Sequence, residues 1–132
     1  MADDALILSI DQGTTSTRAI LFKTSGHPVF TAQQEFRQIF PDLGWVEHDP
    51  EEIWATTLRV CREAVEWSRK ESMTIVGLGI TNQRETTVIW DRETGEPIHN
   101  AIVWQDRRTA GFCDELKLAG RDAQIQPRTR LQ

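Results

Sequence analysis

A glycine, several hydroxylated residues and an arginine occur together near the start of the chain, in the stretch D-Q-G-T-T-S-T-R. Gly13 would let the backbone approach a ligand closely, and successive backbone N–H groups in such a turn can bind an anion. Three hydroxyl donors follow: Thr14, Thr15 and Ser16. The guanidinium of Arg18 suits a phosphate, and the carboxylate of Asp11 could hold Mg²⁺ directly or through a water. The stretch therefore predicts a phosphate-binding turn, or an ordinary hairpin turn, in which the same residue types are common.

A second group of candidate binding residues lies further along the chain. Arg84 and Glu85 follow an apolar run at residues 74–80, and loops at the carboxyl ends of strands are where α/β sheets bind ligands. Arg84 offers donors and Glu85 an acceptor, so the pair can satisfy both roles of a polyol hydroxyl. The indole of Trp104 could pack on a carbon chain while its N–H donates. The alternative is an exposed Arg–Glu pair and a core tryptophan, as we expect for the others: Trp45, Trp54, Trp67 and Trp90.

Apolar runs predict the strands that carry the first group. Residues 5–10, 18–22 and 29–36 predict three strands joined by tight turns, and therefore an antiparallel meander. The D-Q-G-T-T-S-T stretch would be a hairpin between the first two strands, with Gly13 at its bend.

A helix is predicted next. Asp49 is a suitable N-cap, Pro50 suits the first helical position, and the helix should end near Lys70. An apolar stripe that includes Trp54 and Ala64 should face the core. His48, at the entry to this helix, has no nucleophile paired with it and is interpreted as structural.

The second half of the chain predicts more strands and one more helix. Residues 74–80 predict a buried parallel strand, and residues 86–90 and 101–104 two further strands. Residues 107–119 predict a helix that Gly120 stops. Residues 121–132 predict neither helix nor strand. Strands and helices in this order predict an α/β domain.

Size and charge limit the function classes. The chain has 132 residues, enough for one modest domain, and a formal net charge of −5. That charge argues against a nucleic-acid partner, which needs a clustered basic face. We expect a soluble, cytoplasmic protein, because the sequence shows no signal peptide and no membrane span. Cys61 and Cys113 lack metal-type spacing and are interpreted as buried free thiols.

Four strings, in the same order, resemble one family. The D-Q-G-T-T-S-x-R string resembles the first phosphate motif of the actin-like ATPase superfamily. Taken at its full length, it resembles the motif of the carbohydrate kinases and, among them, that of the glycerol kinases. Three later strings resemble the glycerol kinases: G-W-V-E-H-D-P from Gly44, G-I-T-N-Q-R-E-T from Gly79 and N-A-I-V-W-Q from Asn100. The resemblance covers the chain from near Ile7 to near Gly120.

The resemblance implies a fold, a reaction and its ligands. The fold would be an incomplete ribonuclease H-like N-terminal lobe, a mixed sheet with an antiparallel meander and flanking helices. ATP, with Mg²⁺, would bind at the stretch from Asp11 to Arg18, and glycerol at Arg84, Glu85 and Trp104. Full-length relatives would be homo-oligomers. The family's catalytic aspartate lies in a later part of its longer chains, so no residue here is assigned as catalytic.

Two functions stay open, and the end of the chain differs from the family. The chain is either part of a glycerol kinase or a catalytically silent lobe that binds ligands weakly or interacts with other chains. Thr129-Arg130-Leu131 stands where relatives have Thr-Gly-Leu, and Pro127 is unusual. Arg130 would be unfavourable if that position needs a positive φ. We therefore expect a partial kinase lobe over residues 1–120 and a divergent or truncated tail over residues 121–132.

Overall fold

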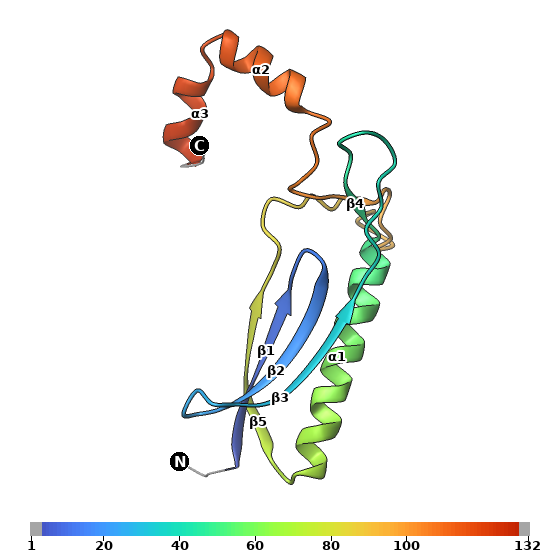
Figure 1. The fold of residues 1–132 in the computed structure, drawn as a ribbon, viewed down its shortest axis with the longest axis vertical. Helices are drawn as coiled ribbons and strands as arrows, with labels where there is room; N and C mark the ends of the chain where they lie inside the picture. Colours follow the sequence, from blue (N-terminus) through green and yellow to red (C-terminus); the bar gives the residue numbers. More distant parts are fainter. Residues whose placement is uncertain (1–3, 130–132) are drawn as a thin grey trace.

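A four-stranded mixed sheet is the centre of the fold (Figure 1). A computed structural model describes residues 4–129, and its main sheet has the order β3-β2-β1-β5. β1 (Ala5–Gln12), β2 (Ser16–Lys23) and β3 (Pro28–Glu35) are antiparallel neighbours, whereas β5 (Thr74–Thr81) pairs in parallel with β1. The predicted meander and the parallel direction of the later strand are both confirmed.

Helix α1 (Pro50–Lys70) lies along one face of this sheet (Figure 1). Its start is as predicted, because Pro50 is the first helical residue and the side chain of Asp49 accepts a hydrogen bond from the backbone N–H of Glu51. The helix packs mainly on β2 and β3. The core between helix and sheet consists of buried aliphatic side chains: Leu6, Leu8, Ile10, Ala19, Leu21, Ala32, Val60 and Ala64.

The face of α1 that is buried differs from the predicted stripe. Thr56, Val60, Ala64 and Ser68 are buried, and they follow one another at every fourth position. Trp54 lies two positions before Thr56, about 200° around the helix at 100° per residue, and its side chain is exposed. The expectation that Trp54 and Trp90 belong to the core is therefore wrong, since both are more than half exposed.

The predicted burial of β5 is also wrong. Val76, Leu78 and Ile80 are 62%, 60% and 70% exposed. β5 is an edge strand, and α1 lies over β2 and β3 rather than over this edge. Apolar composition therefore predicted the strand and its parallel pairing, but burial depends on where the helix lies.

A second, two-stranded sheet lies beyond the end of α1 that begins at Pro50. It consists of β4 (Glu47–His48) and β6 (Ala101–Ile102), which are antiparallel. The strand predicted at residues 86–90 is absent from the described structure, where only isolated bridges join Thr87 to Ile102 and Trp90 to Pro97. Pro97 has no N–H, so it cannot contribute a donor to a longer ladder.

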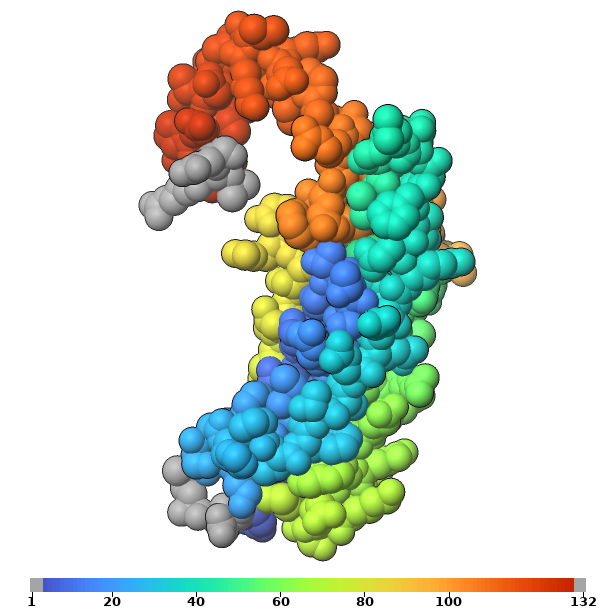
Figure 2. All heavy atoms as spheres, viewed as in Figure 1, coloured from blue at the N-terminus to red at the C-terminus, as the bar shows by residue number. Residues whose placement is uncertain are grey.

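The last described segment consists of two helices, α2 (Ala110–Leu118) and α3 (Asp122–Thr129). Gly120, with a φ of 68°, separates them as expected for a helix stop. No helix was predicted after residue 120, and that expectation is wrong, because α3 forms there. The helix was missed since it has no apolar stripe and buries no residue. Arg130 and Leu131 lie outside the described residues. Figures 1 and 2 show α2 and α3 projecting away from the main sheet.

Two further expectations concern cysteine burial and membrane helices. Cys61 and Cys113 are free thiols, as predicted, but only Cys61 is partly buried and Cys113 is exposed. Burial raises the pKa of the Cys61 thiol. Within residues 4–129, no helix is long and apolar enough to cross a membrane.

Candidate functional site

The turn between β1 and β2 is a tight hairpin, as predicted. Gln12 pairs with Thr17 at its base, and the backbone N–H of Gly13 donates to the carbonyl oxygen of Ser16 over 3.0 Å. A Cβ on Gly13 would lie only 3.0 Å from that same oxygen, so a larger residue would force the backbone to move. The glycine therefore keeps the turn narrow and leaves its outer side open to a ligand.

Side chains at the base of this turn attach it to α1. The Oε1 atom of Gln12 accepts hydrogen bonds from the hydroxyls of Thr17 and Thr57, at 2.9 and 3.0 Å. Thr17 and Thr56 are also in hydrogen-bonding contact, at 3.1 Å between their hydroxyl oxygens. Sequence reasoning gave these residues no role, although two threonines on an apolar helix are a visible signal.

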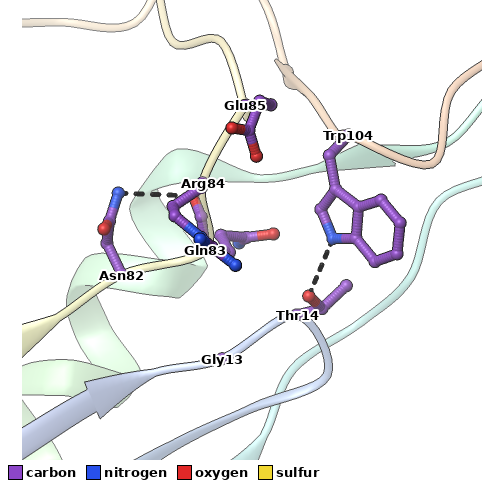
Figure 3. A pocket seen from close by; sticks show the side chains of 7 residues that line it. All are labelled: Gly13, Thr14, Asn82, Gln83, Arg84, Glu85 and Trp104. Carbon is purple, nitrogen blue, oxygen red and sulfur yellow. Dashed lines mark hydrogen bonds between the residues drawn. The ribbon is translucent and has the colours of Figure 1, made fainter. Parts of the chain in front are cut away.

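One cavity of about 400 Å³ is lined by the three candidate polyol residues and by part of the candidate phosphate turn (Figure 3). Its lining residues come from the hairpin turn, the loop after β5 and the segment after β6: Gly13, Thr14, Asn82, Gln83, Arg84, Glu85 and Trp104. The indole nitrogen Nε1 of Trp104 donates to the hydroxyl oxygen of Thr14 over 3.0 Å. The three candidate polyol residues and one candidate phosphate residue thus share a single space.

Glu85 has an unusual backbone conformation in this cavity. Its φ is 56°, in the left-handed region that residues with a side chain rarely adopt. Such a conformation costs of the order of 1–3 kcal/mol and occurs often at functional sites. Sequence reasoning had no signal for it, because Glu is not a residue that marks a left-handed turn.

The other candidate phosphate residues lie outside the lining of this cavity. Arg18 and Asp11 form an ion pair of 3.0 Å across β1 and β2, and both side chains are partly exposed. Thr15 is exposed at the tip of the hairpin. Ser16 is buried, and its hydroxyl oxygen accepts a hydrogen bond from Gln33 over 2.9 Å. The structure therefore brings Thr14, but not these four residues, to the polyol group.

A buried ionic network holds the segment that carries Trp104. Arg108 contacts Glu47 at 2.7 Å and Asp106 at 2.8 Å, and the two carboxylate side chains are only 5% and 3% exposed. Asp106 also accepts from the backbone N–H of Val46 at 2.7 Å. Its hydrogen bonds with Arg108 lower the pKa of Asp106 to about 2.

The helix predicted over residues 107–119 starts later than expected, after Asp106 and Arg108. The helix begins at Ala110, because both side chains are held in the loop before it. The guanidinium of Arg108 also lies 3.9 Å from the centre of the Trp45 ring, a cation–π contact. The loop that follows Gly44 is thereby fixed against the segment after β6.

The residues present fit a phosphate better than they fit a self-sufficient metal site. Gly13 and Thr14 of the turn line the cavity, and a turn of this kind can direct backbone N–H groups and a hydroxyl at an anion. Among residues 4–129, no group of three or more His, Cys, Asp or Glu side chains could hold a metal ion. Mg²⁺ usually takes one or two carboxylates together with waters and phosphates. Asp11 could supply one such carboxylate, and its Oδ2 atom contacts Arg18.

Comparison with known proteins decides the family. Residues 6–132 match the family model described as the N-terminal domain of the FGGY family of carbohydrate kinases. The chain belongs to this family. It is 59% identical over 128 residues to the glycerol kinase of Paraburkholderia phymatum and 58% identical to that of Burkholderia cenocepacia. Each alignment covers 97% of this chain and 26% of the relative, so the chain spans about a quarter of their length.

Solved structures of a glycerol kinase and a xylulose kinase share the fold. The structure of Plasmodium falciparum glycerol kinase with ADP matches with a TM-score of 0.86 and 36% identity, over 92% of this chain and 24% of that one. A xylulose kinase from Lactobacillus acidophilus matches with a TM-score of 0.84 at 22% identity, over 93% of this chain and 24% of that one, which shows the fold alone. The predicted actin-like, ribonuclease H-like fold and the carbohydrate kinase family are confirmed.

Proposed function

We propose that this chain is the N-terminal part of an ATP-dependent glycerol kinase, which transfers the γ-phosphate of ATP to glycerol and yields sn-glycerol 3-phosphate. The observation that carries the proposal is the single cavity in which the turn at Gly13 and Thr14 faces Arg84, Glu85 and Trp104. The curated relatives named above are glycerol kinases, and one related structure was solved with ADP.

The polyol would lie between the loop after β5 and the indole of Trp104. Arg84 offers donors and Glu85 an ionised acceptor, so that each hydroxyl of the polyol can find a partner. Glu85 has a left-handed backbone at this point, and both side chains line the cavity. Figure 3 shows Trp104 across the cavity from them, where its ring face can cover a carbon chain.

The phosphates would lie at the hairpin turn. The hydroxyl oxygen of Thr14 accepts from Trp104 and therefore keeps its own hydrogen for a phosphate oxygen. Arg18 and Thr15 would add positive charge and a donor, Ser16 would support the turn from β2, and Asp11 would hold Mg²⁺ directly or through a water. Bound ATP with its Mg²⁺ would supply the phosphoryl group and neutralise its charge.

An alternative is that the chain by itself is catalytically silent. Among the residues that line the cavity, Glu85 is the one carboxylate, and the proposal uses it to bind a hydroxyl. The exposed apolar side chains of β5 favour this alternative for the isolated chain, because an uncovered apolar face promotes association instead of a defined closed site. The isolated chain would then at most bind a polyol or an anion weakly.

The test is a chimaeric kinase in which this chain replaces the matching 128 residues of the Paraburkholderia phymatum glycerol kinase. We expect ADP release that depends on glycerol and is far slower with xylulose. Arg84→Ala should lower kcat/KM for glycerol roughly 5- to 150-fold, because an unpaired polar group costs about 1–3 kcal/mol. Arg92→Ala, in an exposed turn outside the cavity, is the matched control. An unchanged kcat/KM in Arg84→Ala would refute the assignment.

A further inference from the structure

Three buried or partly buried side chains connect the two sides of the cavity: Gln83, which lines it, and His48 and Gln38, which do not. The Nε2 atom of Gln83 lies 3.2 Å from Nδ1 of His48, and Nε2 of His48 lies 2.7 Å from Oε1 of Gln38. The Nε2 atom of Gln38 then donates to the carbonyl oxygen of Thr14 over 3.2 Å. Gln83 and Thr14 both line the cavity, one in the loop after β5 and one in the hairpin turn.

The hydrogen bonds of this chain allow one arrangement of protons. The amide nitrogen of Gln38 donates to two carbonyl oxygens, those of Thr14 and Phe36, so its oxygen must face His48. His48 must then carry its proton on Nε2, and its Nδ1 is an acceptor for the amide nitrogen of Gln83. The oxygen of Gln83 in turn accepts from the hydroxyl of Thr86 over 3.2 Å.

The surroundings of His48 favour the neutral ring that this arrangement requires. Its side chain is fully buried on β4, and its ring packs edge-to-face with that of Phe36 at 5.0 Å between centroids. Burial lowers the pKa of His48, although the charge of Glu52 acts in the opposite direction. His48 does not line the cavity, and both ring nitrogens have partners. It is therefore not placed to exchange a proton with a substrate.

We propose that His48 is a positioning residue, which holds the phosphate turn and the polyol loop at a fixed separation through Gln38 and Gln83. The proposal rests on the proposed function, because that separation sets the distance between phosphoryl donor and acceptor. A change in it leaves each ligand its own binding residues but moves the reacting atoms apart, and a misplacement of about 1 Å can cost about 10²-fold in rate. The effect should therefore appear in kcat rather than in KM.

The first part of the test uses the 132-residue chain and does not depend on kinase activity. Long-range ¹H–¹⁵N NMR spectra report which ring nitrogen of each histidine carries a proton, and His48→Gln assigns the signal. We expect a single neutral ring protonated on Nε2 at pH 7. A ring protonated on Nδ1, or on both nitrogens, would overturn the proposal.

The second part uses the chimaeric kinase with two variants of the same residue. His48→Phe keeps a buried ring against Phe36 and removes both hydrogen bonds. We expect its kcat to fall about 10²-fold, with both KM values within about threefold of the parent. His48→Gln can donate to Gln38 and accept from Gln83, so its kcat should be at least about tenfold higher than that of His48→Phe.

A buried variant outside the network separates positioning from simple loss of stability. Val60→Ala removes core volume from α1, at a side chain that is 1% exposed and outside the cavity, and should leave kcat unchanged. A His48→Phe enzyme with parental kcat, or a Val60→Ala enzyme with an equal loss, would overturn the proposal. If the parent chimaera does not phosphorylate glycerol, the proposed function is refuted and the positioning role with it, whereas the NMR result still tests the hydrogen bonds of His48 separately.

Discussion

The indole nitrogen of Trp104 donates a 3.0 Å hydrogen bond to the hydroxyl oxygen of Thr14, across 90 positions of sequence. Thr14 lies in the hairpin of the main sheet, whereas Trp104 follows the short strand β6 of the second sheet. The bond therefore joins the proposed phosphate side of the cavity to its polyol side. Because Trp104 is the donor, Thr14 keeps its own hydrogen for a ligand.

Trp104→Phe should weaken the use of ATP as well as that of glycerol in the chimaeric kinase. The ring remains for packing, but Thr14 loses the donor that orients its hydroxyl. A hydrogen bond contributes about 0.5–1.5 kcal/mol, so KM for ATP should rise roughly 2- to 12-fold. Steady-state kinetics with Trp90→Phe, an exposed tryptophan outside the cavity, as the control would measure this. A KM for ATP equal to that of the parent would contradict the coupling.

Two substitutions of Glu85 should separate its charge from its backbone. Glu85→Gln keeps the left-handed backbone and removes the charge, so glycerol affinity should fall while the free energy of unfolding stays the same. Glu85→Gly should lose glycerol affinity too, yet keep or gain up to about 1 kcal/mol of stability, because glycine adopts a positive φ without strain. Urea unfolding of the chain measures the second effect. A loss of more than about 1 kcal/mol in Glu85→Gly would show that this backbone is not strained.

Arg108→Met should be strongly destabilising. It leaves the carboxylates of Glu47 and Asp106 buried without their cation, and breaking a buried pair in this way typically costs about 3–5 kcal/mol. The matched control is Arg59→Met, which breaks the exposed pair with Glu63 on α1 and should cost only about 0.3–0.5 kcal/mol. Urea unfolding at neutral pH compares the two, and equal losses would contradict the importance of the buried network.

The acid limit of stability should depend on Asp106. Its pKa is lowered in the folded chain from 3.8 to about 2, chiefly by the side-chain hydrogen bonds with Arg108. The unfolded chain therefore binds the proton first, so the stabilisation is complete above the unfolded value and is lost as the pH falls from about 4 towards 2. Asp106→Asn should be less stable at pH 7 and should flatten this part of the stability curve. The control is Asp114→Asn, at a side chain that is 72% exposed, which should leave the curve of stability against pH unchanged. An Asp106→Asn curve identical to that of the control would refute the prediction.

The 132-residue chain alone should show no measurable phosphorylation of glycerol. Phosphoryl transfer requires the γ-phosphate, the metal and the attacking hydroxyl to be held in line, and the described residues offer only one side of that geometry. Removal of a general base alone typically costs about 10²–10⁴-fold. Purified chain with ATP, Mg²⁺ and glycerol, followed by detection of glycerol 3-phosphate, is the measurement. Turnover above that of an Asp11→Ala control would show that the chemistry resides in this segment.

Features that depend on neighbouring residues could be predicted from the sequence. The hairpin at Gly13, the helix start at Asp49 and the helix stop at Gly120 each follow from backbone rules that act over a few positions. The apolar run at residues 74–80 likewise predicted a parallel strand, and β5 pairs in parallel with β1. Family motifs added the candidate residues Arg84 and Trp104, which the fold places in one cavity.

Only the tertiary structure decided how these pieces meet. The contact of Trp104 with Thr14 and the link from Gln83 to His48 join segments that lie far apart in the sequence, and no local pattern encodes such long-range distances. The burial of β5 was predicted wrongly for the same reason. A strand's composition shows that it can be buried, but the position of α1 over β2 and β3 determines which strands are covered.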